Sequence, residues 1–203
     1  MTMQELGSKL TELQYTIKSN KIVLDRARKE LLETKELIGV LDQANTVLKV
    51  IGENKKRATI EMFERVVTAS LKEVFDFDYR FIIEVSSDKK ILTKFKLRQP
   101  NGLELDVMDS CGGGVVDVVS FVLKALMLAS IRPKRTQVMF LDESFSRVSS
   151  DYVPKVADLL VSLSKQLNMK FLLVTHQTYF LEVATHGYEI SKQGNEVIFN
   201  RTV

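Results

Sequence analysis

Two adjacent carboxylates, Asp142 and Glu143, follow an apolar, strand-like segment at residues 138–141. Ligands in open α/β sheets collect at the carboxyl ends of the strands. Successive strand residues point to opposite faces, so the two acids can take separate tasks. Asp142 could hold Mg²⁺, directly or through water, and Glu143 could orient or deprotonate an attacking water. The alternative is a solvated strand end with two ordinary acids.

A turn rich in glycine comes earlier in the chain, just before an apolar, helix-like segment. Its residues are Ser110, Cys111, Gly112, Gly113 and Gly114, called the glycine turn below. Glycines at a helix start expose backbone N–H groups and the positive end of the helix dipole, and this surface suits a phosphate group. The alternative is a flexible turn capped by Ser110.

A histidine follows a second apolar segment, at residues 171–174. This histidine, His176, comes directly after Thr175. At the end of a parallel strand it could reach a γ-phosphate or an attacking water at the same sheet edge as the two acids. The alternative is a structural histidine, which is how we interpret His186 in its expected loop.

Three cations, Lys94, Lys96 and Arg98, alternate with apolar residues. In a strand the three would share one face, and Lys89 and Lys90 come just before them. Such a stripe could contact DNA phosphates. The alternative is a solvated sheet face.

The elements that position these residues alternate between strands and helices. We expect an antiparallel meander of strands at 80–85, 91–97 and 103–107, then a helix at 115–131, a strand at 137–141, a helix at 151–167, a strand at 170–175, a short helix from Tyr179, and strands at 187–190 and 196–200. Alternation of this kind predicts an α/β fold with a mostly parallel sheet beside the meander.

The N-terminal third contains no proline and predicts one long helix. Its apolar seam repeats in steps of four and three: Leu6, Leu10, Leu13, Ile17, Asn20, Leu24, Ala27, Leu31, Thr34, Ile38, Leu41, Asn45 and Leu48. This period is typical of a coiled coil, roughly 65 Å long at about 1.5 Å per residue. The alternative is an amphipathic helix packed on its own domain. We therefore expect a coiled-coil helix at 1–55 and a globular part at 56–203, which the helix enters through a denser apolar stretch at 60–75.

Composition limits the class of protein. The 203 residues fit one domain plus an appendage, and 45% hydrophobic content is enough for a core. No apolar segment approaches the roughly 20 residues that a membrane span needs, and residues 1–10 lack the apolar region of a secretory signal. We expect a cytoplasmic protein, with nucleoid association as an option. A net charge of +3 does not by itself indicate nucleic-acid binding.

In order, spacing and context, residues 50–203 resemble the C-terminal lobe of SMC, RecN and RecF-like ABC-type ATPase heads, and the coil before them resembles the returning arm. The resemblance implies that the glycine turn is the signature loop, which completes the ATP site of an opposing head. It implies that Asp142 is the Walker B magnesium residue and Glu143 the catalytic glutamate. Val148 and Ser149 fall in the D-loop, and His176 matches the switch histidine.

The sequence departs from the family pattern at two places. Cys111 stands between Ser110 and the glycine pair, and Gly114 takes the place of the usual Gln or Glu. Either Ser110 or Cys111 could then face a nucleotide. The aspartate expected after Val148 is replaced by Ser149, with Asp151 two positions later.

A P-loop of the form G-x-x-x-x-G-K-[ST] is absent, and no Gly-Lys pair occurs. The resemblance therefore implies that ATP and Mg²⁺ require a P-loop-bearing partner lobe, and that the isolated chain is inactive. It also implies a homo- or heterodimer formed through the coil and the head, acting in DNA repair, recombination or replication. The alternatives are a non-catalytic coiled-coil dimerisation or interaction protein with a degenerate ATPase fold, and DNA binding through the basic stripe without nucleotide.

Overall fold

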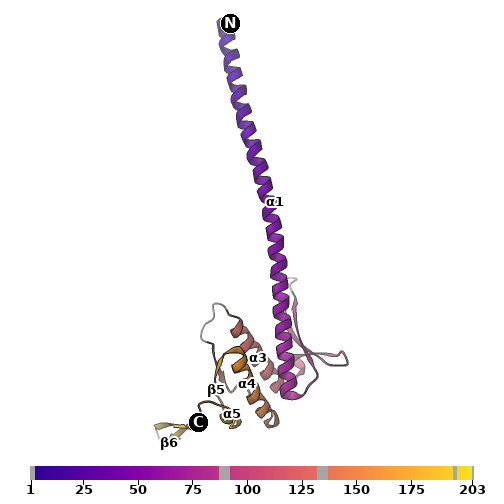
Figure 1. The fold of residues 1–203 in the computed structure, drawn as a ribbon, viewed down its shortest axis with the longest axis vertical. Coiled ribbons are helices and arrows are strands. Elements are labelled where there is room, and N and C mark those ends of the chain that lie inside the picture. The colour runs from indigo at the N-terminus through magenta and orange to yellow at the C-terminus, as the bar shows by residue number, and fades with distance from the viewer. Residues whose placement is uncertain (1–2, 87–91, 132–136, 194–195, 203) are drawn as a thin grey trace. The chain divides into compact units, whose positions relative to one another are not determined.

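The computed structural model describes residues 3–86, 92–131, 137–193 and 196–202. The chain divides into two compact units, Met1–Arg57 and Ala58–Val203, called unit 1 and unit 2 below. Helix α1 (Met3–Phe75) supplies all the described residues of unit 1 and continues into unit 2. The predicted long N-terminal helix is therefore confirmed, and the elements of an α/β fold follow it (Figure 1).

The apolar seam of unit 1 is exposed along α1. Its exposed members are Leu6, Leu10, Leu13, Ile17, Leu24, Leu31, Ile38, Leu41 and Leu48. The polar seam residue Thr34 donates its hydroxyl to the carbonyl oxygen of Glu30 at 2.7 Å, so this hydroxyl needs no partner from a facing helix. The seam thus has the apolar surface that pairing with a second helix would bury.

Helix α1 ends in unit 2 with a buried stripe. Val67, Leu71 and Val74 are completely buried, as the dense apolar pattern of this segment predicts. Asp76 then takes a left-handed conformation, with φ 57°, and its N–H donates to the carbonyl oxygen of Lys72 at 3.0 Å. This is a common way to end a helix.

The predicted meander forms the first sheet of unit 2. Its antiparallel strands are β1 (Arg80–Ser86), β2 (Leu92–Arg98) and β3 (Glu104–Asp106), in the order β1-β2-β3. Gly102, at φ 88°, occupies the turn between β2 and β3, where a side chain would be strained.

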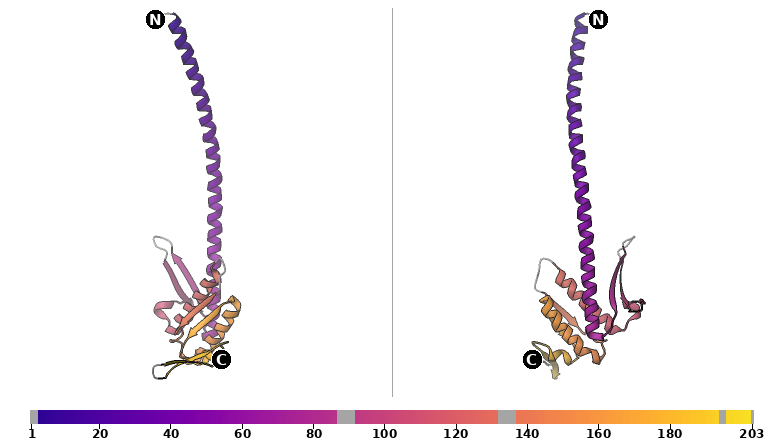
Figure 2. Two further views of the ribbon diagram at one scale, coloured as in Figure 1. Left: turned by 90° about the vertical axis from the view of Figure 1, so that its left-hand side faces the viewer. Right: turned by 45° about the vertical axis from the view of Figure 1, so that its right-hand side comes forward.

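The outer edge of β1 is satisfied by side chains of α1. The N–H groups of Phe81 and Ile83 donate to Thr68 Oγ1 and Glu64 Oε1, each at 2.9 Å. The two acceptor side chains lie one helical turn apart on α1, and the two N–H donors lie two residues apart on β1, so both hydrogen bonds form together. The right-hand view of Figure 2 shows this sheet beside the end of α1.

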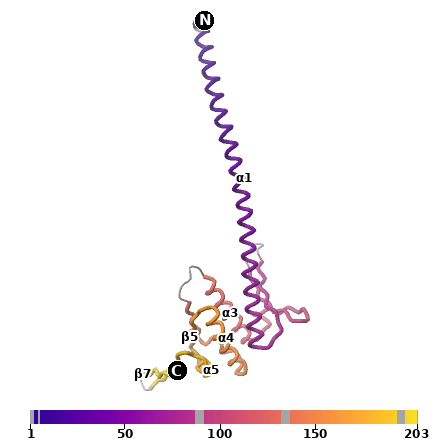
Figure 3. The backbone as a smooth tube through the Cα atoms, in the orientation of Figure 1, coloured from indigo at the N-terminus to yellow at the C-terminus, as the bar shows by residue number. Residues whose placement is uncertain are grey.

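The rest of unit 2 alternates between helices and strands. In chain order it contains α2 (Val107–Ser110), α3 (Gly113–Ser130), β4 (Val138–Asp142), the 3₁₀ helix η1 (Ser150–Tyr152), α4 (Val153–Leu167), β5 (Lys170–Val174), α5 (Tyr179–Glu182), β6 (Tyr188–Gln193) and β7 (Glu196–Arg201). Figure 3 follows the backbone through α3, α4 and β5. Helix α2 was not predicted, because a single turn has no usable periodicity.

Strands β4 and β5 pair in parallel, and β6 and β7 form an antiparallel hairpin of their own. The α/β class is confirmed. Within the described residues, however, the parallel sheet contains only this one pair of strands, because the last two strands of the chain pair with each other.

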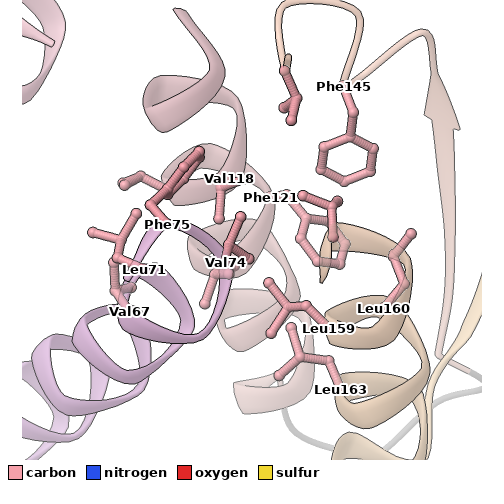
Figure 4. Close-up of a cluster of buried hydrophobic side chains, with 14 of the residues drawn as sticks. Val67, Leu71, Val74, Phe75, Val118, Phe121, Phe145, Leu159, Leu160 and Leu163 are labelled. Carbon is pink, nitrogen blue, oxygen red and sulfur yellow. The ribbon is translucent and has the colours of Figure 1, made fainter. Parts of the chain in front are cut away.

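The core of unit 2 lies between these elements. Phe121 of α3 packs edge-on against Phe145 and against Phe171 of β5, with ring centroids 5.3 Å apart in both pairs. Figure 4 shows residues of α1, α3 and α4 meeting in this cluster. The inner faces of β4 and β5 pack here as well, through residues such as Leu141 and Leu173.

Helix α3 is apolar because it is the central core helix. Within the described part of the chain it is the one helix long and apolar enough to cross a membrane, with 18 residues and a mean hydropathy of 1.7. The expectation that no segment approaches such a length is therefore wrong. In the structure Val118, Val122 and Ala125 are completely buried against the rest of unit 2.

Replacing Phe121 by alanine should remove much of this packing. We expect Phe121→Ala to lower the free energy of unfolding by about 3–5 kcal/mol, because a large ring leaves a cavity in the core. Chemical denaturation followed by circular dichroism measures the change. Phe140→Ala is the matched control: its ring is exposed, so the change should stay below about 0.5 kcal/mol. Equal losses in both variants would contradict the assignment of the core.

Candidate functional site

The parallel pair β4–β5 brings the two acids and the histidine to one end of a sheet. Asp142 lies opposite Val174 in the strand register. The N–H of Glu143 extends the ladder by donating to the carbonyl oxygen of Val174 at 2.9 Å. His176 follows two residues later, so both strands deliver their polar residues at the same edge.

Glu143 leaves the strand through an unusual backbone conformation. Its φ is 44°, a left-handed value that costs a residue with a side chain about 1–3 kcal/mol. The carbonyl oxygen of Glu143 accepts from the N–H of Ser146 at 3.1 Å, which closes the following turn. Strand alternation therefore ends at Asp142. The expected alternation of the two acids along the strand thus does not extend to Glu143.

Glu143 and His176 are in direct contact, with Nδ1 of the imidazole 2.9 Å from Oε2 of the carboxylate. The side chains remain 71% exposed for His176 and 43% for Glu143. A contact this exposed adds little stability.

Asp142 lies at the end of an exposed apolar sheet face. Phe140, Leu172 and Val174 are 74%, 53% and 57% exposed, and Val138 lies at the start of the same alternating set. The other face of β4–β5 packs into the core. Parallel strands are normally covered on both faces, whereas this pair is covered on one. We call the uncovered surface, formed by Val138, Phe140, Leu172 and Val174, the open face.

The donor set at the strand end fits Mg²⁺ held jointly with phosphates. No three His, Cys, Asp or Glu side chains form a metal cluster in the described ranges. Mg²⁺ usually binds one or two carboxylates and completes its shell with waters and substrate phosphates. Asp142, exposed at the strand end, can provide such a ligand.

The glycine turn joins α2 to α3. Ser110 is exposed, whereas Cys111 is partly buried and its thiol donates to the carbonyl oxygen of Asp106 at 3.8 Å. Burial, and after it the charge of Asp106, raises the pKa of the Cys111 thiol. The side chain that faces outward is therefore that of Ser110.

Two of the three glycines lie so close to Arg147 and Val148 that a Cβ atom there would crowd them. A Cβ atom at Gly113 would lie 2.8 Å from Cδ of Arg147, and one at Gly114 would lie 3.0 Å from the carbonyl oxygen of Arg147 and 3.1 Å from Cα of Val148. A Cβ atom at Gly112 would meet nothing within 4 Å. The glycine turn is thus seated on the segment that follows Glu143.

The residues expected in the D-loop differ in their environment. Val148 is buried, and its N–H donates to the carbonyl oxygen of Phe145 at 3.1 Å. Ser149 is exposed and precedes η1. Through Arg147 and Val148, the segment that follows the two acids therefore adjoins the glycine turn.

Sequence reasoning missed Arg147 and Asp117, which form an ion pair beside the glycine turn. The sequence offered one indication, because Asp117 is the only acid within the apolar run of residues 115–123. No pattern in the sequence indicates which cation it meets.

The basic stripe is largely neutralised by neighbouring strands. Lys96 Nζ lies 2.8 Å from Glu84 Oε1 and 3.1 Å from Glu104 Oε2, and Arg98 Nη2 lies 2.6 Å from Glu104 Oε1. These pairs raise the pKa of Lys96 and lower that of Glu104. Lys94 is exposed. Lys89 and Lys90 lie outside the described residues.

The comparisons by sequence find nothing: no protein-family model matches the chain, and no curated protein matches it. Solved structures do match. An SMC head domain with a coiled coil and joint from Pyrococcus yayanosii is 13% identical, with a TM-score of 0.64 over 87% of this chain and 33% of that one.

Two further SMC structures agree. An SMC head with an extended coiled coil from Pyrococcus furiosus, bound to the C-terminal domain of ScpA, is 14% identical, with a TM-score of 0.59 over 98% of this chain and 50% of that one. A structure from work on the ATP-driven dimerisation of SMC ATPases is 12% identical, with a TM-score of 0.56 over 74% of this chain and 89% of that one.

The fold is therefore that of part of an SMC-like ATPase head together with its coiled-coil helix. The chain spans a third to a half of the two head structures that carry a coil. At 12–14% identity the likeness concerns the fold alone.

The packing of the glycine turn can be tested by adding single methyl groups. We expect Gly114→Ala to lower the free energy of unfolding by about 1–2 kcal/mol, because its Cβ would press on backbone atoms that cannot move aside easily. Thermal and urea unfolding measure the effect. In the control Gly112→Ala we expect almost no change in the free energy of unfolding. Alanine caps the helix less well than glycine, but it also lowers the entropy of the unfolded chain, and these opposite effects should roughly cancel. Equal stability of the two variants would show that Gly114 is not packed closely against Arg147 and Val148.

Proposed function

We propose that this chain is the C-terminal part of an SMC-like ATPase head, which supplies the acids, the histidine and the glycine turn of a composite ATP site. The observation that carries this proposal is the contact between Glu143 and His176 at the common end of two parallel strands, beside Asp142. Such an edge is where α/β folds bind ligands.

Each residue then has a distinct task. Magnesium, when bound with ATP, would neutralise charge on the phosphates. Asp142 would provide a carboxylate ligand at the strand end. Glu143 would orient or deprotonate the attacking water, and His176 would hold the Glu143 carboxylate in place through Nδ1 while its other ring nitrogen stays available to a phosphate or water.

The phosphates themselves would be bound by a P-loop on another lobe. The open face supports this part of the proposal, because an exposed apolar face on a parallel sheet is a surface to be covered. Since the open face runs directly into Asp142, a lobe that covers it would bring its own groups to the acids. That lobe belongs either to another polypeptide or to another part of the same one.

The glycine turn would act on the ATP of an opposing head. Its exposed Ser110 and the N–H groups at the start of α3 suit the phosphates of a nucleotide carried by a second molecule. The dimerisation of heads and the DNA stimulation named for one similar structure, and the ScpA bound in another, are properties of those proteins. For this chain we propose a head dimer that acts in DNA repair, recombination or replication, in the cytoplasm or on the nucleoid.

Direct DNA binding by the basic stripe is less well supported. Lys96 and Arg98 are already paired with carboxylates, so releasing them to phosphates would break these contacts. A DNA-dependent role would then arise from the assembled dimer. The competing function is a non-catalytic interaction protein, favoured by the absence of a P-loop from the sequence.

The substitution Glu143→Gln tests the proposed hydrolysis. In the full chain assembled with a P-loop-bearing lobe, we expect turnover to fall by at least about 100-fold while nucleotide binding persists, because the amide cannot accept a proton from water. Phosphate release and nucleotide titration measure the two quantities. Glu61→Gln, which changes an exposed glutamate on α1, is the control. Unchanged turnover in Glu143→Gln would refute the assigned base. Failure of the unmodified assembly to bind nucleotide would favour the interaction protein.

The open face can be tested separately from catalysis. We expect Phe140→Asp to weaken association with the P-loop lobe by at least about tenfold, because a charge replaces an exposed ring that the partner would desolvate. Isothermal titration or sedimentation measures the affinity. Met108→Asp, at another exposed apolar side chain of unit 2, is the control. Equal affinities for the two variants would place the partner elsewhere.

A further inference from the structure

The segment from Glu143 to Val148 contacts both His176 and the glycines at the start of α3. At its start, Glu143 meets His176. In its middle, the carbonyl oxygen of Phe145 accepts from Nε2 of Gln177 at 3.3 Å. At its end, Arg147 reaches the beginning of α3. We call residues 143–148 the linking segment.

Arg147 binds Asp117 through two nitrogen atoms. Its Nε lies 3.1 Å and 3.3 Å from the two carboxylate oxygens of Asp117, and its Nη2 makes a further hydrogen bond to Oδ1. The arginine side chain is 60% exposed, but that of Asp117 is only 10% exposed. A carboxylate shielded in this way depends on its partner, and the planar guanidinium fixes the direction of approach.

Gly113 makes room for this arginine. A Cβ atom there would lie 2.8, 3.1 and 3.2 Å from Cδ, Cβ and Nε of Arg147. The side chain of Arg147 therefore crosses the first turn of α3 directly over Gly113 before it reaches Asp117, four residues further on. Gly114 lies against the backbone of the same arginine.

The linking segment has a second attachment to α3, in the core. The ring of Phe145 is buried and meets Phe121 edge-on, with ring centroids 5.3 Å apart. Figure 4 labels both residues in the buried cluster. On its other side Phe145 stacks on Phe180 at 5.7 Å. Asp117 and Phe121 are four residues apart, so they lie on the same face of α3. One attachment is ionic and at the surface, and the other is apolar and buried.

We propose that Arg147 is a positioning residue: with Asp117 it forms a clamp that makes the glycine turn and the acidic strand end move as one body. The role of the clamp in catalysis rests on the proposed function. The mechanical connection between the two segments does not, because it is a property of the isolated chain. A nucleotide that engages the glycine turn would shift the first turn of α3, and the clamp would transmit this shift through the linking segment to Glu143 and His176. Because coupling between two sites is reciprocal, a change at Glu143 and His176 would in turn affect the glycine turn.

Amide hydrogen exchange on the full chain tests the clamp without any ATPase. We expect Arg147→Gln to speed exchange at least about tenfold at residues 112–116 and at residues 144–148 together, because local opening becomes easier. Exchange in β6 and β7 should not change. Arg98→Gln is the matched control, since it breaks another arginine–carboxylate pair, in which Nε and Nη2 of Arg98 both donate to Oε1 of Glu104. Asp117→Asn should reproduce the effect of Arg147→Gln, and Arg147→Lys should be intermediate, because it keeps the charge but loses the fork.

Turnover in the assembled complex tests the purpose of the clamp. We expect Arg147→Gln to reduce turnover at saturating ATP by about tenfold with nucleotide affinity changed less than about twofold, and Arg147→Lys to recover part of the loss. Unchanged exchange in Arg147→Gln would overturn the clamp whatever the turnover. Faster exchange with unchanged turnover would overturn its role in catalysis. If the unmodified complex shows no hydrolysis, the proposed function fails, and the exchange result alone decides whether the two segments move together.

Discussion

Parallel pairing of β4 with β5 is the constraint on which the candidate site depends. Both strands run in the same direction with Asp142 opposite Val174, so the residues that follow them emerge together. The left-handed backbone of Glu143 then turns its carboxylate toward His176. A strained backbone at this position can persist only because the surrounding contacts hold it, and such strain is frequent at functional sites.

Helix α3 links this edge to the core. Its first turn seats the glycine turn against Arg147 and Val148, and its buried face packs with α1, α4 and the inner face of the parallel pair. Close-packed interiors transmit displacement rather than absorb it. The apolar composition of α3, which resembles that of a membrane span, allows it to pack closely in the core. A closely packed helix is in turn a rigid support for the glycine turn and for the segment after Glu143.

The fold was predictable where the determining interactions are local. Apolar periodicity identified α1, α3, α4 and the strands, because side-chain burial follows the geometry of each element. The convergence of Asp142, Glu143 and His176 was expected from the order of the strands. The pairing of Arg147 with Asp117 was not, because it joins residues far apart in the chain and depends on a glycine that has room for the arginine. The ion pairs that neutralise the basic stripe were missed for the same reason, since strand register decides which carboxylate meets Lys96.

The open face is the feature on which our proposal of a covering lobe rests. Two parallel strands bury one face against α3 and α4, yet leave Phe140, Leu172 and Val174 in water. Removing such side chains from water is worth about 25 cal/mol per Å² of apolar surface, so covering the open face would supply favourable free energy for association directly beside Asp142. A lobe bound there would complete the sheet and exclude water from the acids at the same time. Stability and chemistry would then depend on the same contact, because electrostatic interactions strengthen as solvent leaves the site.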